Sequence, residues 1–67
     1  MKITLNNRIE TFDKTSLSIA EIIRLKNFTF KLLVTKINGQ LIKKEEREQA
    51  RVKDGDQVVI LHLISGG

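Results

Sequence analysis

Few side chains in this sequence can carry out chemistry by themselves. The chain of 67 residues has no cysteine and a single histidine, His62. A thiol nucleophile, a disulfide and a metal site of several Cys and His ligands are therefore excluded. What remains is the end of the segment QVVILHLISGG, where a strand-like apolar run leads directly into Gly66 and Gly67. This pair is either a disordered chain end, as termini often are, or a functional segment.

The sequence pattern before the two glycines predicts a buried strand with two apolar faces. We predict a central strand from Gln57 to Ile64, since it contains the most apolar run of the chain. By alternation, Val58 and Ile60 share one face with His62, and the residues between them share the other. We assign Val58 and Ile60 to the core and His62 to a half-exposed position without a catalytic or metal-binding role.

The first half of the chain predicts a hairpin and one helix. Period-two alternation indicates strands at residues 2–5 and 9–12, joined by a tight turn at Asn6–Asn7. In LSIAEII, Ser18 and Glu21 have the spacing of a capping box. Leu17 and Ile22 are placed for a hydrophobic staple, and the helix is expected to end near Asn27.

The second half predicts two more strands and a short connector before the last strand. Asn38–Gly39 is a type I′ turn signal between two short strands within residues 30–42. Residues 43–50 are charged and predict a single helical turn or a 3₁₀ connector. Asp54–Gly55–Asp56 predicts the turn that opens the last strand.

These elements indicate an α+β fold in one domain spanning residues 1–67, with a flexible Gly-Gly tail. The expected architecture is a mixed sheet of four to five strands packed on one main helix, because a lone amphipathic helix must bury its face against the sheet. This describes a β-grasp, the ubiquitin-like fold, as one option among several α+β layouts.

Five pieces of the chain, in order, resemble one known family. They are MKITLNN, LSIAEII, INGQLI, DGDQVVIL and the final GG, and they span nearly the whole sequence. In this combination they resemble the ThiS family, the small sulfur carriers of thiamine (thiazole) biosynthesis. Each piece is a weak signal alone, and the order, spacing and chain length make the combination specific.

The resemblance implies a function for the tail. The carboxylate of Gly67 would be adenylated by an E1-like, ThiF-like activating enzyme that uses ATP and Mg²⁺. A sulfur donor such as a cysteine desulfurase would convert it to a thiocarboxylate, which a ThiG-like thiazole synthase would consume. Gly66, without a Cβ, and Ser65 would occupy the channel of the activating enzyme. The chain would bind no cofactor and act as a protein cosubstrate, not as an enzyme.

The outward side of the last strand is the candidate docking surface. If Val58 and Ile60 are core, then Val59, Leu61 and Leu63 form an exposed apolar stripe beside the tail, and such a patch usually marks a partner site. The alternative is that both faces of the strand are buried.

Three other functions remain open from the sequence. The small subunit of molybdopterin synthase and ubiquitin-like protein modifiers share the fold and the tail, although the short, proline-free chain favours the thiamine branch. A nucleic-acid-binding module is a remote alternative, since the net charge is +4 but the basic residues are scattered and Phe12, Phe28 and Phe30 are the only aromatic residues. We expect a location in the cytoplasm, or in the plastid stroma, because the sequence shows no signal peptide or membrane span. We also expect the protein alone to be a monomer.

Overall fold

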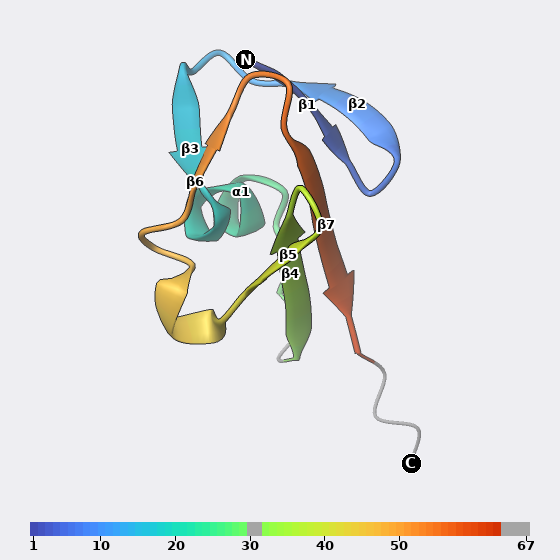
Figure 1. Cartoon of the computed structure of the whole chain (residues 1–67), viewed down its shortest axis with the longest axis vertical. Helices are drawn as coiled ribbons and strands as arrows, with labels where there is room; N and C mark the ends of the chain where they lie inside the picture. The colour runs from blue at the N-terminus through green and yellow to red at the C-terminus, as the bar shows by residue number, and fades with distance from the viewer. Residues whose placement is uncertain (30–31, 64–67) are drawn as a thin grey trace.

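A mixed sheet of five strands forms one layer of the molecule (Figure 1). The computed structural model describes residues 1–29 and 32–63. The spatial order is β2-β1-β7-β4-β5, and only the pair β1–β7 is parallel. β7 is therefore the central strand, as predicted. The strands are β1 (Lys2–Leu5), β2 (Arg8–Thr11), β4 (Leu33–Ile37), β5 (Gln40–Ile42) and β7 (Gln57–His62).

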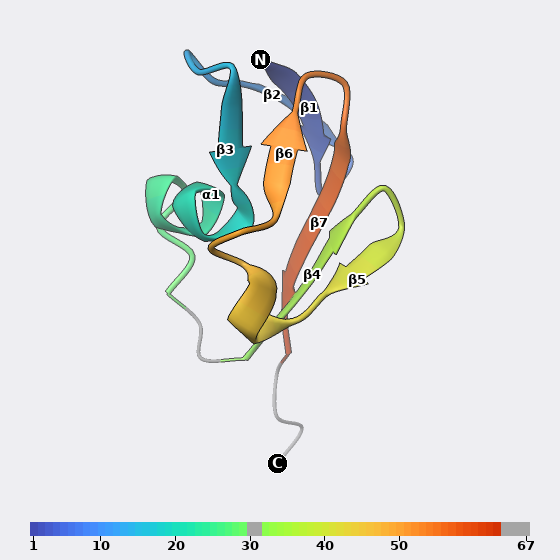
Figure 2. The same ribbon diagram turned by 60° about the vertical axis from the view of Figure 1, so that its left-hand side comes forward.

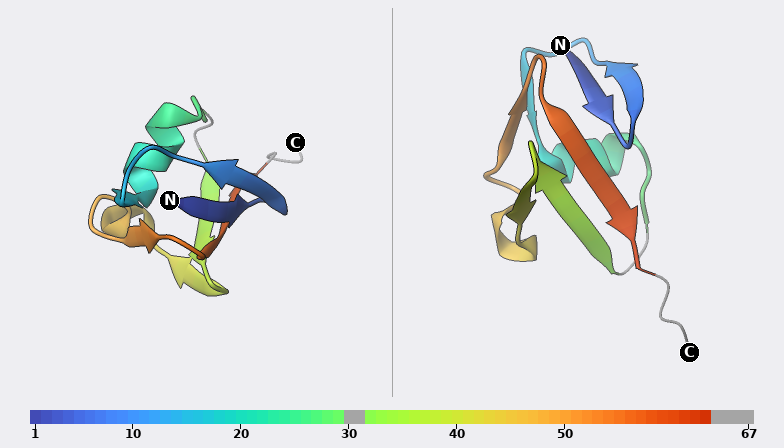
Figure 3. Two further views of the ribbon diagram at one scale, coloured as in Figure 1. Left: turned by 90° about the horizontal axis from the view of Figure 1, so that it is seen from above. Right: turned by 45° about the vertical axis from the view of Figure 1, so that its right-hand side comes forward.

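The second layer covers only one face of this sheet. It consists of helix α1 (Ile19–Leu25), the 3₁₀ turn η1 (Lys44–Glu46) and a two-stranded sheet of β3 (Ser16–Ser18) and β6 (Arg51–Lys53). Figure 2 shows β3 and β6 side by side next to the helix. Figure 3 shows that no described element lies across the opposite face of the sheet, which we call the outer face.

Both predicted hairpin turns are present. Asn6 and Asn7 have φ angles of 51° and 67°, and Asn38 and Gly39 have φ angles of 51° and 83°. Two successive positive φ values define a type I′ turn, whose twist matches that of the flanking strands. The turn before β7 is also confirmed, since the Asp56 amide bonds the Lys53 carbonyl at 3.1 Å around Gly55.

Helix α1 begins as predicted, with a capping box. The Glu21 amide donates to Ser18 Oγ at 3.0 Å, and the Ser18 amide donates to Glu21 Oε1 at 2.8 Å. The bond from the Ser18 amide to the Glu21 carboxyl is the main cause that lowers the pKa of this group, and the Ser18 hydroxyl, Arg51 and Arg24 lower it further against the effect of desolvation.

The helix ends two residues before the predicted end, with Lys26 as its C-cap. Asn27 adopts a left-handed φ of 57°, and the Phe28 amide donates to the Ile23 carbonyl at 2.9 Å. This is a Schellman motif, in which a left-handed residue turns the chain out of the helix. Asn27 therefore terminates the helix and does not extend it.

Strands β3 and β6 were missed by the sequence prediction, and this is a correction. Leu17, the residue predicted for the hydrophobic staple, lies in β3, directly opposite Val52 of β6. Each strand is three residues long and carries one core side chain between polar ones, which is too short a pattern to show periodicity. The buried core combines both layers and consists of Ile3, Leu5, Leu17, Ile19, Ile22, Val52, Val58 and Ile60.

The connector between β5 and β6 contains the predicted 3₁₀ turn and is attached to both layers. The Arg47 carbonyl accepts from the Ala20 amide at 3.0 Å in the helix. The Arg47 side chain reaches back to the sheet, as described below. Within the described residues, no helix is long and apolar enough to cross a membrane.

Candidate functional site

The two faces of β7 differ sharply in exposure. Val58 and Ile60 are 0% and 4% exposed and point into the core, as predicted. On the other face Leu61 and Leu63 are 52% and 55% exposed. Val59 is only partly exposed, so the exposed part of the predicted stripe begins at Leu61.

Neighbouring strands extend this stripe into a patch on the outer face. Val34 of β4 lies opposite Leu61, and Lys36 lies opposite Val59. Lys36 also lies opposite Leu41 of β5, which is 57% exposed. We call the following residues the outer apolar patch: Leu32, Val34, Leu41, Val59, Leu61 and Leu63.

Leu32, Val34 and Leu41 were not identified as site residues from the sequence. A signal for Leu41 was present, because a two-residue type I′ turn at Asn38–Gly39 fixes the pairing of Ile37 with Gln40. That register places Leu41 beside Lys36. The pairing of β4 with β7 spans a longer stretch of chain, so no local rule sets it.

Two asparagines of the hairpin turns hold β7 from both sides. Asn6 Oδ1 accepts from the Ile60 amide at 2.8 Å, and Asn6 Nδ2 donates to the Ile60 carbonyl at 2.9 Å. Asn38 Oδ1 accepts from the Gln57 amide at 2.8 Å, and the Asn38 amide donates to the Gln57 carbonyl at 2.7 Å. The Asn6 side chain thus replaces a strand partner after β1 ends, and holds β7 close to where the tail begins.

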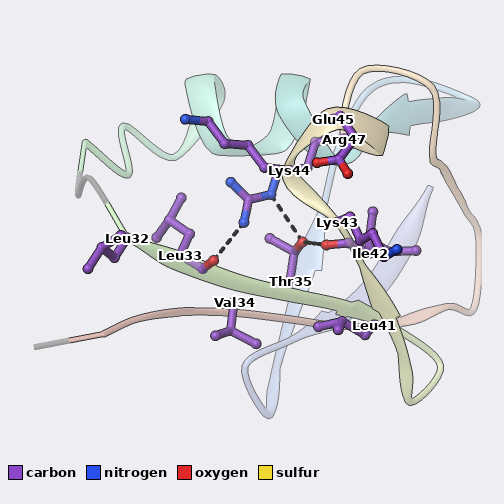
Figure 4. Close-up of a pocket in the computed structure, with 10 residues that line it drawn as sticks. All are labelled: Leu32, Leu33, Val34, Thr35, Leu41, Ile42, Lys43, Lys44, Glu45 and Arg47. Atoms are coloured by element: carbon purple, nitrogen blue, oxygen red, sulfur yellow. Dashed lines mark hydrogen bonds between the residues drawn. The ribbon is translucent and has the colours of Figure 1, made fainter.

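A groove of about 370 Å³ lies beside β4 and η1 (Figure 4). Inside it the Arg47 guanidinium donates to the Leu33 carbonyl at 2.6 Å and to Thr35 Oγ1 at 3.2 Å. Thr35 is fully buried and donates in turn to the Ile42 carbonyl at 2.7 Å. In Figure 4, Val34 and Leu41 lie on the opposite side of β4 from Arg47. Arg47 therefore attaches the connector to β4 without covering the patch.

The remaining predicted residues follow Leu61 in the sequence. His62 is exposed at the end of β7. The described part of the chain holds no group of three or more His, Cys, Asp or Glu side chains arranged for a metal ion. The predicted tail residues Ser65, Gly66 and Gly67, and the predicted strand end Ile64, lie outside the described residues.

The fold itself defines a class of protein. One helix packs across a mixed five-stranded sheet whose central strands are the parallel pair β1 and β7. This is the β-grasp, or ubiquitin-like, architecture that the sequence predicted. The model of the ThiS family matches residues 3–67, and the chain belongs to this family.

Solved structures agree with this assignment. The crystal structure of a thiamine biosynthesis protein (ThiS) from Geobacter metallireducens is 32% identical, with a TM-score of 0.85 over 100% of both chains. An NMR solution structure of a thiamine biosynthesis protein from the same organism is 32% identical, with a TM-score of 0.76 over 100% of this chain and 88% of the other. The comparison with curated proteins gives no match.

Proposed function

We propose that this protein is a sulfur carrier of thiamine biosynthesis and that the carboxylate of Gly67 is its reactive group. A carboxylate resists nucleophiles because of its negative charge, so it must first be activated. A ThiF-like enzyme holding ATP and Mg²⁺ would supply the activation. The carrier would be consumed and recharged as a protein cosubstrate.

The proposed chemistry has three steps. A Gly67 carboxylate oxygen attacks the α-phosphorus of ATP and displaces pyrophosphate, which gives an acyl-adenylate. A persulfide from a donor such as a cysteine desulfurase attacks the acyl carbon, and AMP leaves. A thiol reductant then cleaves the sulfur–sulfur bond, which leaves a thiocarboxylate for a ThiG-like thiazole synthase.

The observation that carries this proposal is the family match, which extends to Gly67 itself. The architecture supports it. The central strand ends at His62, and the outer-face side chains at that end, Leu61 and Leu63, are apolar and exposed. Because the chain has no cysteine, any sulfur that it carries has to be attached at another group.

Two observations favour the thiamine branch over a molybdopterin synthase subunit and over a nucleic-acid-binding module. The solved neighbours are described as thiamine biosynthesis proteins and not as molybdopterin synthase subunits. For nucleic-acid binding, base stacking needs exposed aromatic rings, whereas Phe12 and Phe28 are partly buried and pack against the core.

The test is the mass of the protein after incubation with its activating enzyme. With ATP, Mg²⁺ and the cognate ThiF-like enzyme we expect an acyl-adenylate. With a sulfur donor and reductant added, we expect a mass increase equal to the difference between sulfur and oxygen. Deletion of Gly67 should abolish both products while the fold stays intact. Full activity of this deletion variant would refute the carrier function.

Docking is tested with a pair of matched substitutions. Leu61→Lys places a charge on the outer apolar patch, whereas Leu25→Lys makes the same change at a 60% exposed position on the helix side. We expect Leu61→Lys to raise the KM for the carrier in adenylation and Leu25→Lys to leave it unchanged. Equal KM values for the two variants would place the docking surface elsewhere.

A further inference from the structure

The charges around the outer face are distributed very unevenly. The chain has eight acidic residues, and all of them lie among the described residues. Only Glu10 lies in a strand of the main sheet, and its register partner is the core residue Ile3, so it faces the helix layer. There it forms an ion pair of 3.0 Å with Lys26.

The remaining acidic side chains lie in turns or in the helix layer. Two of them pair with arginines there, since Glu21 and Glu48 accept from Arg51 and Arg24. Asp54 and Asp56 are held in the turn before β7 by bonds to the Lys2 and Lys53 amides. Asp13 lies between β2 and β3, and Glu45 and Glu46 belong to η1. No strand of the main sheet therefore presents a carboxylate on the outer face.

Two lysines, in contrast, lie on the outer face. Lys2 alternates with the core residue Ile3 and so shares the outer face. Lys36 is exposed, and its register partners are Val59 on one side and Leu41 on the other. A positive charge thus stands within the outer apolar patch, and the face carries no negative charge from its strands to balance it.

We propose that Lys36 is a specificity-determining residue of the docking surface and that it selects an activating enzyme whose apolar contact surface carries a carboxylate. This inference rests on the proposed function and goes beyond it by stating the chemistry of the partner. A lysine surrounded by apolar residues loses water when the patch is covered. The lost hydration of the ammonium group is offset only where the partner places an anion opposite Lys36.

The positive charge of Lys36 should act mainly on the rate at which the carrier associates with its activating enzyme. Complementary charges steer the encounter of two proteins before they touch, so we expect the charge of Lys36 to change mainly the association rate and its dependence on salt. At about 0.05 M salt the field of Lys36 extends beyond 10 Å, whereas at about 0.5 M it is largely screened. A partner without an acidic group would show no such dependence on Lys36.

The experiment compares Lys36→Glu with Lys36→Gln in the full chain, assayed with the cognate ThiF-like enzyme by pyrophosphate release. At about 0.05 M salt we expect the KM for the carrier to rise about ten-fold for Lys36→Glu and about three-fold for Lys36→Gln, with kcat unchanged. At about 0.5 M salt both increases should shrink.

Lys14→Glu is the matched control, because it changes net charge equally at a site between β2 and β3. Thermal unfolding of each variant verifies the fold, and if Lys36→Glu does not fold, the neutral Lys36→Gln decides the question. Equal KM values for the Lys36 and Lys14 variants at low salt would overturn the proposal, as would tighter binding of Lys36→Glu. If the wild-type carrier is not adenylated at all, the proposed function fails instead.

Discussion

Asn6 is the residue whose substitution tests most directly how the central strand is held. Asn6→Gly keeps the positive φ of the turn but removes both side-chain bonds to Ile60, of 2.8 and 2.9 Å. Each neutral hydrogen bond contributes about 0.5–1.5 kcal/mol. The two together predict a loss of about 1–3 kcal/mol in the free energy of unfolding.

The matched control is Asn7→Gly. Asn7 is the second residue of the same turn, with φ 67°, and its side chain makes neither of the bonds to Ile60. Both variants introduce the same flexible residue, so the difference between them isolates the two hydrogen bonds. For a domain of this size each kcal/mol corresponds to about 4–8 °C in Tm. Asn6→Gly should therefore unfold at least about 4 °C below Asn7→Gly in a circular dichroism melt.

A second readout localises the effect. Hydrogen exchange of the Ile60 amide should accelerate in Asn6→Gly more than exchange in the helix, since the lost bond is to that amide. If both glycine variants melt at the same temperature and Ile60 stays protected, the side chain of Asn6 does not hold β7, and the reasoning fails.

Three further results are expected. Ser18→Ala removes the acceptor for the Glu21 amide and should cost about 0.5–2 kcal/mol in urea denaturation; an unchanged midpoint would contradict the role of this cap. The depressed pKa of Glu21 contributes stability that is fully present above the ordinary glutamate pKa and is lost as the pH falls through the lower folded-state value. The stability difference between wild type and Glu21→Gln should therefore disappear in acid, and a difference that persists would be evidence against the linkage. Thr35→Val leaves the Ile42 carbonyl and an Arg47 donor without their partner and should cost about 1–3 kcal/mol, whereas an unchanged Tm would show that water replaces the hydroxyl.

The sequence predicted the elements whose signals are local. A capping box needs Ser18 and Glu21 three residues apart, and a type I′ turn needs two residues that tolerate positive φ. Such features are fixed by neighbours along the chain, so they can be recognised without knowing the fold. The parallel pairing of β1 with β7 was not predicted, because the sequence indicated a mixed sheet without indicating which of its strands pair.

The features that were missed depend on residues far apart in sequence. β3 and β6 exist because Leu17 and Val52 meet across 35 residues, and neither three-residue segment shows a pattern by itself. Asn6 was recognised as a turn residue, but its second role requires Ile60 to lie beside it. Similarly, the outer apolar patch combines three strands, and only their register brings Val34 next to β7 and Leu41 next to β4 on the same face.

The outer face also explains why β7 appeared to have two apolar faces. A chain of 67 residues with a helix of seven residues has enough second-layer surface to cover one side of a five-stranded sheet and not both. Stability alone would favour polar residues at Leu61 and Leu63, because more than half of each side chain remains in water. When local rules for a stable fold are broken shortly before the candidate reactive group in the sequence, binding of a partner is the most direct physical account. Under the proposed function, the apolar outer face of β7 is one half of an interface and not part of the core.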